Sequence, residues 1–372
     1  MNLKQVVKSI VLKLPAFKRR YINQLLASNT YFTKIEQLAP ALEEANKVIL
    51  DHPQNKKVGL VKDGIFHDLI SIRAYYPKYE RFLKNNNIKY EYYDILAHDW
   101  QDRAKQYDII IWHTDSDPST QEIAINKIYV LEKLMGKKCL PTFDEIWSYE
   151  NKINAHYLFN QHSLPEIPTF VSHNKSDIGE YLNQAKFPII SKLDTGSASE
   201  GVEKIDTLSN SLSMLDKVFS FSGRKTYFDY KNQKNYVLFQ EFMNDATFDL
   251  RIMVVGDKLF GYYRYPNKGD YKASGAGNYE KKEIDPIALD LAFKVKEKYR
   301  ARFLATDLLY SKKYNQYFII ESSIFIGVDT CEQLVIDGKA GYYQRISEGQ
   351  YEFCEGKYWV QELTLAELFK EY

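Results

Sequence analysis

A lysine and a loop of small residues directly follow an apolar strand pattern in the middle of the chain. The strand pattern covers residues 187–190, and Lys192 stands at its end. The small residues of the loop are Gly196, Ser197, Ser199 and Gly201. Glycine and serine leave room for backbone N–H groups to turn toward an anion, and the lysine adds a positive charge. The segment indicates phosphate binding, although glycines at this spacing also occur by chance and a lysine at a strand end is often merely exposed.

Two acidic residues further along the chain also follow apolar runs. Asp307 comes after residues 303–306, and Glu321 comes after residues 318–320. A buried carboxylate is unfavourable unless it is paired or binds a metal ion. Acids at the ends of two successive strand patterns are therefore typical of an ion pair or a cation site.

Polar residues of matching character lie between the lysine loop and these acids. Residues 240–243 read Gln-Glu-Phe-Met at a strand end, and Asp249 opens the next strand pattern. The cations of the following hairpin and glycine-rich loop are Arg251, Arg264, Lys268 and Lys272. The order of all these motifs resembles the ATP-grasp superfamily of carboxylate–amine ligases. The likeness covers roughly residues 146–330 and is nearest to peptide–glutamate ligases, with D-alanine–D-alanine ligases more distant.

The resemblance implies that the protein uses ATP and Mg²⁺ and gives each motif a role. The residues expected to bind ATP are Lys152, Lys192, Gly196, Ser197, Ser199 and Gly201 at the phosphates, Glu241, Phe242 and Met243 at adenine, and Asp249 at the ribose. Those expected near the reacting groups are Arg251, Arg264 and Lys272. Those expected to bind Mg²⁺ are Asp307, Glu321 and Ser323. Without the resemblance, the sequence would indicate that Lys152 is a solvent-exposed lysine on a helix. Lys268 and Lys272 would then be ordinary surface residues.

The resemblance also implies a reaction, in which ATP phosphorylates a carboxylate and an amine displaces phosphate to form an amide. Two departures from the family pattern leave alternatives open. Ser323 stands where asparagine is usual, and Ser199 stands where a further glycine is common. A nucleotide-binding or scaffold protein with a degenerate site, or a phosphotransferase on the same fold, would fit these departures.

Composition excludes several classes of protein. The 372 residues carry a net charge of +1, so nothing in the overall charge indicates a nucleic-acid partner. Cys139, Cys331 and Cys354 form no C-x-x-C pair, which argues against a disulfide framework or a zinc site and favours the cytoplasm. The sequence contains no apolar run long enough to span a bilayer, and the N-terminus lacks the features of a signal peptide.

The chain divides into segments at 1–55, 56–145, 146–235 and 236–372. The first is a helical arm, whose residues 1–20 form a basic amphipathic helix, followed by a second helix at 35–49. This arm either binds an anionic membrane at its inner face, as suits an enzyme that amidates a uronic acid of a surface polysaccharide, or packs on the body or in a homodimer. The second segment alternates strands with helices, including one at 69–85, and predicts a small parallel sheet. The third begins with a helix at 147–158, and the fourth is mainly antiparallel and ends in a C-terminal extension. Residues 113–117 follow a strand end and serve either as a ligand loop or as a helix N-cap, with the cap slightly favoured.

Overall fold

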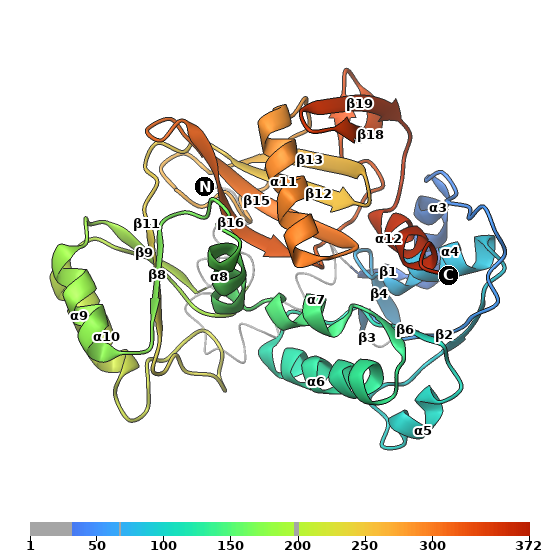
Figure 1. Cartoon of the computed structure of the whole chain (residues 1–372), viewed down its shortest axis with the longest axis horizontal. Coiled ribbons are helices and arrows are strands. Elements are labelled where there is room, and N and C mark those ends of the chain that lie inside the picture. The colour runs from blue at the N-terminus through green and yellow to red at the C-terminus, as the bar shows by residue number, and fades with distance from the viewer. Residues whose placement is uncertain (1–31, 67, 197–200) are drawn as a thin grey trace.

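The computed structural model describes residues 32–66, 68–196 and 201–372. The chain forms a mixed α/β molecule with several separate sheets. Figure 1 shows a small lobe at one end, a large antiparallel sheet above the centre, and a parallel α/β unit at the other end. The lysine loop and the acids described above belong to the small lobe and the large sheet. The amphipathic arm over residues 1–20 lies outside the described residues, so its membrane role stays a prediction.

The α/β unit, which we call the front domain (residues 56–145), has a four-stranded parallel sheet in the order β5-β2-β6-β7. Its strands are β2 (Lys57–Leu60), β5 (Lys89–Tyr92), β6 (Ile109–Ile111) and β7 (Lys138–Leu140). Its helices are α4 (Tyr76–Asn85), α5 (Trp100–Ala104), α6 (Pro118–Tyr129) and the π-helical turn η1 (Val130–Leu134) that continues α6. The predicted parallel sheet is therefore confirmed, with its apolar strands buried between helices.

Two predicted helices near the front domain have the wrong bounds. The helix expected at 69–85 begins only at Tyr76, because β4 (Leu69–Ser71) pairs with β1 (Phe32–Lys34) and β3 (Ile65–Phe66) in a small antiparallel sheet. The helix expected at 35–49 is α3 (Ile35–Glu43), and the chain after it extends toward β2. In the first case a short apolar run was compatible with either helix or strand, and pairing with a distant segment decided the outcome.

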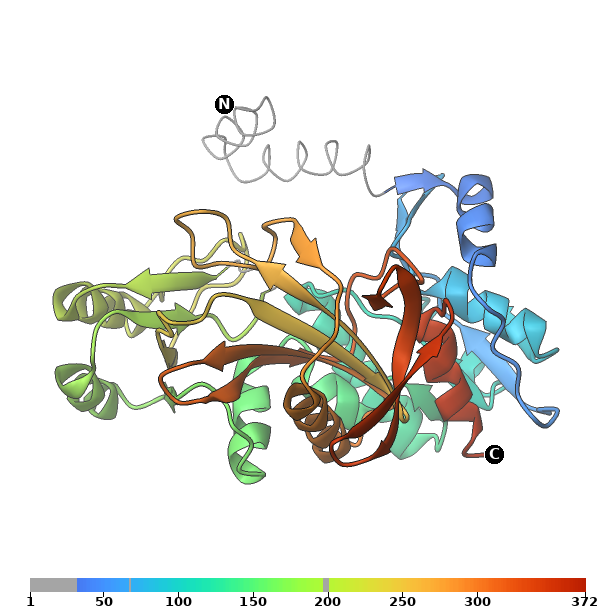
Figure 2. The same cartoon turned by 90° about the horizontal axis from the view of Figure 1, so that it is seen from above.

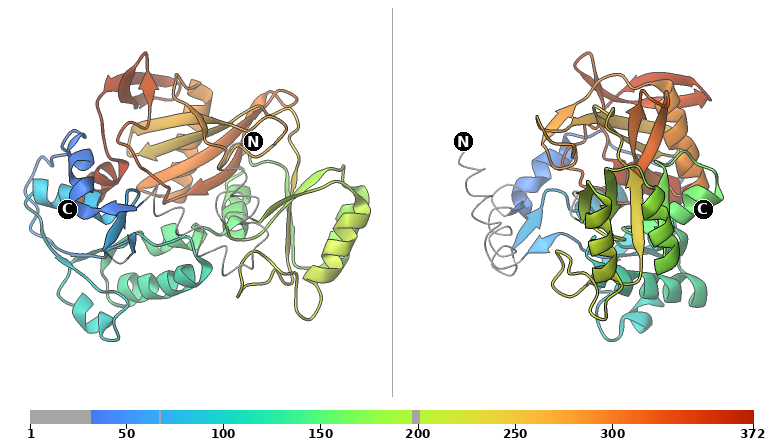
Figure 3. Two further views of the ribbon diagram at one scale, coloured as in Figure 1. Left: turned by 180° about the vertical axis from the view of Figure 1, so that it is seen from behind. Right: turned by 90° about the vertical axis from the view of Figure 1, so that its left-hand side faces the viewer.

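The small lobe, which we call the first lobe, is a four-stranded antiparallel sheet covered by two helices. Its strands are β8 (Thr169–Ser172), β9 (Ile189–Lys192), β10 (Val202–Ile205) and β11 (Val237–Glu241), and its helices are α9 (Lys175–Gln184) and α10 (Leu208–Val218). Lys192 is the last residue of β9, as the strand pattern predicts. Figure 3 shows this lobe, in green to yellow-green, standing clear of the rest of the molecule.

The helix predicted at 147–158 is divided in two. The first part, α7 (Phe143–Ser148), starts with a capping box between Thr142 and Glu145, and the second part is α8 (Lys152–Gln161). Glu150 between them has a φ of +53°, and the side chain of Asn151 caps α8 by accepting a hydrogen bond from the Asn154 backbone N–H. Lys152 consequently stands in the first turn of α8 and not in the middle of a solvated helix.

The large sheet, which we call the second lobe, carries the acids and arginines singled out in the sequence. Its strands are β12 (Asp249–Val255), β13 (Lys258–Tyr265), β14 (Asn278–Glu280), β15 (Phe303–Ser311), β16 (Gln316–Ser323), β17 (Val335–Ile336), β18 (Lys339–Ser347) and β19 (Gln350–Glu355). Helix α11 (Pro286–Tyr299) packs on β12 and β15. The predicted turn at Gly256 joins β12 to β13, and its φ of +54° is one that glycine adopts readily.

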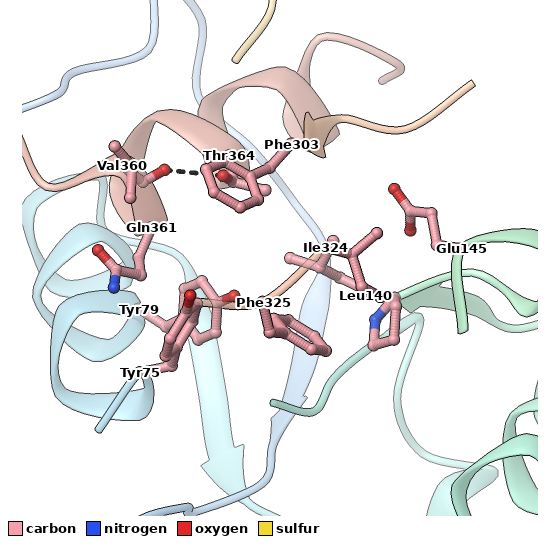
Figure 4. A pocket seen from close by; sticks show the side chains of 11 residues that line it. Tyr75, Tyr79, Leu140, Glu145, Phe303, Ile324, Phe325, Val360, Gln361 and Thr364 are labelled. Atoms are coloured by element: carbon pink, nitrogen blue, oxygen red, sulfur yellow. Dashed lines mark hydrogen bonds between the residues drawn. The ribbon is translucent and has the colours of Figure 1, made fainter. Parts of the chain in front are cut away.

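The C-terminal helix α12 (Val360–Phe369) joins the second lobe to the front domain. It packs against α4 on one side and β12 on the other. One continuous apolar core runs through the front domain and the second lobe, whereas the first lobe has a separate core that includes Ile178, Val218 and Phe239. Figure 4 shows the junction, where Tyr75 and Tyr79 lie beside Phe325 of the second lobe and Gln361 of α12. Figure 2 shows the same junction from above, at the end of the molecule opposite the first lobe.

Candidate active site

The front domain, the first lobe and the second lobe together line one large cleft. Its volume is about 1270 Å³. The first lobe contributes Ile190, Lys192 and Val202, the second lobe contributes residues of β12, β13, β15 and β16, and the front domain contributes the loop 113–116 after β6. Every predicted site residue that the structure describes, except Gly201, lines this cleft. Ser197 and Ser199 lie outside the described residues, so their predicted contact with phosphate stays a prediction.

Two lysines lie together on the floor of the cleft. The Nζ of Lys152 donates a hydrogen bond to the backbone oxygen of Gly196 at 2.6 Å and forms an ion pair with Glu321 at 3.0 Å. Although burial opposes it, attraction to Glu321 and Glu150 raises the pKa of Lys152 above its ordinary value. Lys192 is more weakly compensated, and burial lowers the pKa of its ammonium group to about 8. The two cations are therefore buried close together, and an anionic ligand would stabilise their charged forms.

Gly201 lies behind Lys192 and shapes the loop instead of lining the cleft. Its backbone oxygen accepts a hydrogen bond from Leu193 N at 3.0 Å, and its φ is +76°. A β-carbon at this position would lie 2.7 Å from Leu193 Cδ1. A glycine is therefore required here to bring the returning strand β10 close to β9.

Two arginines and two aspartates form a buried network on the second lobe. Arg251 donates to both carboxylate oxygens of Asp307 at 2.7 Å each, and Arg264 bridges Asp307, at 2.6 Å, to Asp249. Although burial alone would raise it, the pKa of Asp307 lies well below its ordinary value because of the two guanidinium groups. The pKa of Asp249 is raised by burial and by the neighbouring Asp307. The sequence placed both arginines near the reacting groups, and the structure adds that Asp307 orients them.

The acidic residues on β15 and β16 are the predicted magnesium ligands, and in the structure each is paired with a cation: Asp307 with Arg251 and Arg264, and Glu321 with Lys152. Asp307 and Glu321 are opposite one another in the strand register, and both line the cleft. Among the described residues, no group of three His, Cys, Asp or Glu side chains gathers as a metal site, so the protein supplies two carboxylates and leaves the other positions open. Such partial coordination by protein is typical of Mg²⁺ in nucleotide sites. The predicted third ligand, Ser323, donates its hydroxyl to the backbone oxygen of Phe325 at 2.5 Å.

The predicted adenine region lies where the first and second lobes meet. The backbone N–H of Glu241 donates to Pro168 O at 3.0 Å, and its carboxylate pairs with Lys313 at 2.8 Å. Met243 is buried among Ile167, Leu309 and Phe318, which form an apolar wall. A flat apolar ligand flanked by backbone polar groups would fit this wall.

The glycine-rich loop over residues 268–278 reaches across the cleft. The Nζ of Lys272 donates to Val202 O on the first lobe at 2.9 Å, and the rings of Tyr271 and Phe242 meet edge to face at 5.6 Å. The loop therefore extends from the second lobe over the cleft to the first lobe. Lys272 lines the cleft while it makes this contact.

The structure also brings residues to the cleft whose function the sequence did not reveal. Glu150 lines it, and burial raises the pKa of its carboxyl to about 7. His113 lines it as well, bonded to Asp63, whereas Asp117 caps α6 by accepting from the backbone of Ser119 and Thr120. The favoured N-cap is thus confirmed for Asp117, and the residues before it belong to the cleft. Asp63 gave no motif of its own; only its place after the first strand of a parallel sheet could have indicated it.

Comparison with known proteins agrees with this architecture. A family model described as a RimK-like ATP-grasp domain matches residues 149–337, just over half of the chain. The chain belongs to the RimK-like ATP-grasp family. The ATP-grasp ligases of this family use ATP and Mg²⁺, which agrees with the two lysines and the two carboxylates in the cleft.

Two curated relatives of this ATP-grasp protein are alpha-aminoadipate–LysW ligases named LysX. The protein from Saccharolobus solfataricus is 32% identical over 167 residues, which is 44% of this chain and 57% of the relative. The protein from Sulfurisphaera tokodaii is 30% identical over 165 residues, covering 43% of this chain and 54% of the relative. The matched segment therefore spans little more than half the length of either relative.

Solved structures share the fold at low sequence identity. A D-cycloserine synthetase, DcsG, superposes with a TM-score of 0.53 and 12% identity, over 72% of this chain and 91% of that one. The D-alanine–D-alanine ligase of Bacillus anthracis complexed with ATP gives a TM-score of 0.50 and 11% identity, over 73% of this chain and 87% of that one. These similarities show that the ATP-grasp fold extends beyond the matched domain into the front domain.

Proposed function

We propose that this protein is an ATP- and Mg²⁺-dependent ligase that joins a carboxylate to an amine. The observation that supports this most strongly is the grouping of Lys152, Lys192 and Glu321 opposite the Arg251–Asp307–Arg264 network in one cleft. Cations held without water suit both the phosphates of ATP and an acyl phosphate formed from the carboxylate.

Each group has a task that follows from its position. Lys152 and Lys192 hold the phosphates at the end of β9, and Arg251 and Arg264 stabilise the negative charge that develops on the carboxylate and the transferred phosphoryl group. Asp307 and Glu321 would hold Mg²⁺, and the ion would supply positive charge for the phosphate oxygens. The loop that carries Lys272 excludes water and so protects an acyl phosphate from hydrolysis.

The experiment that tests the ligase is MgATP turnover, followed as ADP and as free phosphate, with pools of carboxylates and amines. We expect phosphate release that requires both an acid and an amine. ADP formation with the phosphate retained on an acceptor would instead show a phosphotransferase. Tight MgATP binding without turnover in any pool would show a degenerate site, an alternative supported by the Ser323 hydroxyl being engaged by the Phe325 backbone.

For the substrates, we propose an amino acid as the amine and a uronic acid of a surface polysaccharide as the carboxylate. The support is the basic, amphipathic sequence of residues 1–20, which would place the protein at the inner face of a membrane. None of the described helices is long and apolar enough to cross a bilayer. The name of the LysX relatives, alpha-aminoadipate–LysW ligases, supports a competing choice, in which alpha-aminoadipate is one of the two groups that are joined.

Two experiments distinguish the proposed substrates: phosphate release in pools of candidate substrates, and binding to lipid vesicles. Pools with and without uronic acids should differ in phosphate release if the polysaccharide proposal holds. Deletion of residues 1–20 should remove co-sedimentation with phosphatidylserine vesicles and leave turnover on soluble substrates intact. Equal vesicle binding by the full chain and the deletion would contradict the membrane role, and sedimentation velocity on both proteins would show whether the segment instead joins two copies.

A further inference from the structure

A histidine–aspartate pair lies at the front-domain end of the cleft, apart from the phosphate-binding residues. His113 and Asp63 follow the carboxyl ends of the neighbouring parallel strands β6 and β2. The Nδ1 of His113 lies 2.8 Å from the Asp63 Oδ2. Because a carboxylate only accepts hydrogen bonds, this contact places the proton on Nδ1 and leaves the Nε2 lone pair open. Within residues 32–66, 68–196 and 201–372, no hydrogen bond involves Nε2, and the ring lines the cleft.

The surroundings hold both side chains in one orientation. Asp63 accepts hydrogen bonds from the backbone N–H groups of Tyr75, at 2.9 Å, and Tyr76, at 2.7 Å. The ring of Tyr75 stacks on the imidazole with a centroid distance of 4.0 Å and an interplanar angle of 4°. The ring of Phe325 lies beside the imidazole, with a centroid distance of 4.6 Å and an interplanar angle of 81°, and also contacts Tyr75. A carboxylate that orients a histidine in a largely buried site is the usual arrangement for a proton acceptor.

The same contacts connect the pair to the reacting end of the cleft. Phe325, shown beside Tyr75 in Figure 4, follows the end of β16 and accepts the hydroxyl hydrogen bond of Ser323. Tyr75 Oη donates to Ile326 O at 2.7 Å and accepts from Ile326 N at 2.9 Å. The front-domain pair is thus fixed to the strand that carries Glu321.

We propose that His113 is the general base that takes a proton from the incoming ammonium group, with Asp63 as its positioning residue. This proposal rests on the proposed ligase function. The ammonium group gives one proton to Nε2, and the freed amine forms a C–N bond with the acyl carbon of the acyl phosphate. The bond from that carbon to the phosphate oxygen breaks, and the departing phosphate takes the second proton from nitrogen. The imidazolium, stabilised by Asp63, later releases its proton to solvent.

Other titratable groups face His113 and define the competing explanation. Asp63 and Tyr75 contact it directly, and Asp115 lies on the same loop and lines the cleft. Burial raises the pKa of the Asp115 carboxyl. An acid with a raised pKa could also accept a proton, so Asp115→Asn has to be compared with His113→Gln.

The decisive test compares two nucleophiles on the same acyl phosphate. Hydroxylamine is neutral at physiological pH and needs no base, whereas the amine substrate found in the turnover pools arrives as an ammonium ion. We expect His113→Gln to lower amide formation by about 100-fold or more while hydroxamate formation stays within about twofold of the wild type. Raising the pH should restore the amide rate of the variant by about tenfold per pH unit, because only the free amine reacts. Asp63→Asn should lower the amide rate in the same selective way.

Three results would overturn the proposal or its basis. Equal loss of amide and hydroxamate in His113→Gln would assign the histidine a structural role, and the melting temperature of the variant would show the cause. Loss of the amide rate in Asp115→Asn but not in His113→Gln would assign the base to Asp115. His98 is exposed and does not line the cleft, so His98→Gln is the matched control. Its rates of amide and hydroxamate formation should equal those of the wild type. If the wild-type protein forms no hydroxamate with any carboxylate, the ligase function itself is contradicted. The proposed role of His113 as general base is then contradicted as well.

Discussion

Single residues in the cleft differ in how well their charges are compensated, and Lys192 is the least compensated of the phosphate-binding candidates. Because burial lowers its pKa to about 8, the ammonium loses its proton within the range in which binding can be measured. Phosphate stabilises the charged form, so affinity for MgATP should fall as the pH rises above 8. The decrease cannot exceed about tenfold per pH unit for a single proton.

Calorimetric titration of MgATP between pH 7 and 9 measures this effect. Lys192→Arg keeps its charge throughout, so its affinity should be nearly independent of pH. The exposed Lys175 on α9, paired with Asp216, offers a matched Lys175→Arg control that should follow the wild type. A flat profile for the wild type would mean that Lys192 does not touch the phosphates.

Asp307 serves both stability and activity, and the two effects can be separated. Asp307→Asn removes the charge that compensates Arg251 and Arg264 and should lower the free energy of unfolding by about 3 kcal/mol. Glu321→Gln leaves those arginines paired but removes the ion-pair partner of Lys152, so it should also cost stability, by less because Glu321 is one-third exposed and Glu150 still attracts Lys152. Both variants should lose ADP formation, and the double variant should have none. Turnover comparable to the wild type in the double variant, by coupled ADP assay, would contradict the metal assignment.

The depressed pKa of Asp307 also sets the sign of a pH effect on stability. A carboxyl whose pKa is lower in the folded state stabilises the protein above its unfolded pKa, near 4, and loses this contribution as the pH falls. The difference in unfolding free energy between the wild type and Asp307→Asn should therefore be largest near neutral pH and shrink below pH 4. Urea titrations at several pH values measure it, and a difference that grows in acid would contradict the ion-pair account.

The sequence identified many of the individual side chains of the cleft, but it did not predict which residues they pair with. Order and residue type indicated Lys192, Asp249, Asp307 and Glu321, because charged side chains after apolar runs are rare. The pairing of Arg251 with Asp307 arises from the register of β12 and β15, which no local pattern contains. His113 and Asp63 are 50 residues apart in sequence and meet only because β2 and β6 are neighbours.

Among the elements, α12 is the one whose role the sequence left open. Its Glu362 is buried and paired with Arg81 of α4 at 2.6 Å. Arg81→Ala would leave Glu362 as an uncompensated buried charge, so we expect a loss of about 3–5 kcal/mol in unfolding free energy. Replacing both with apolar residues, as in Arg81→Met with Glu362→Leu, should recover most of that loss. Chemical denaturation of the three proteins measures it, and additive losses in the double variant would show that the two charges act independently.

Strand and helix bounds were predictable where pattern and tertiary context agreed. The strands around Lys192 and the β12–β13 hairpin follow alternation and turn residues. The helices at 69–85 and 147–158 did not follow their pattern, because a strand pairing and an N-cap at Asn151 interrupt them. The cap at Asn151 is local, whereas the pairing of β4 with β1 joins distant segments, and in both places the competing helix pattern is just as strong in the sequence.

For the whole molecule, the division into two apolar cores predicts two levels of stability. The first lobe has the smaller, separate core, so its amides should exchange with solvent at a lower opening free energy than those of β12 and β15. The proposed MgATP site lies between the lobes, so MgATP should protect β9 and β11 more than the front-domain sheet. Hydrogen exchange with mass spectrometry, with and without MgATP, measures both. Uniform exchange over the whole chain would contradict the two-core description.

The shared core of the front domain and the second lobe has a consequence for specialisation. The loop after β6 and the arginines of β12 and β13 extend from elements that share one apolar core. The lysine of β9 lies on the first lobe, which has its own core. On the proposed function, the acceptor site is built on this shared core, so we expect that a few loop residues can be exchanged without altering the nucleotide site. Grafting that loop from one related protein onto another should therefore transfer the acceptor preference without a change in MgATP affinity.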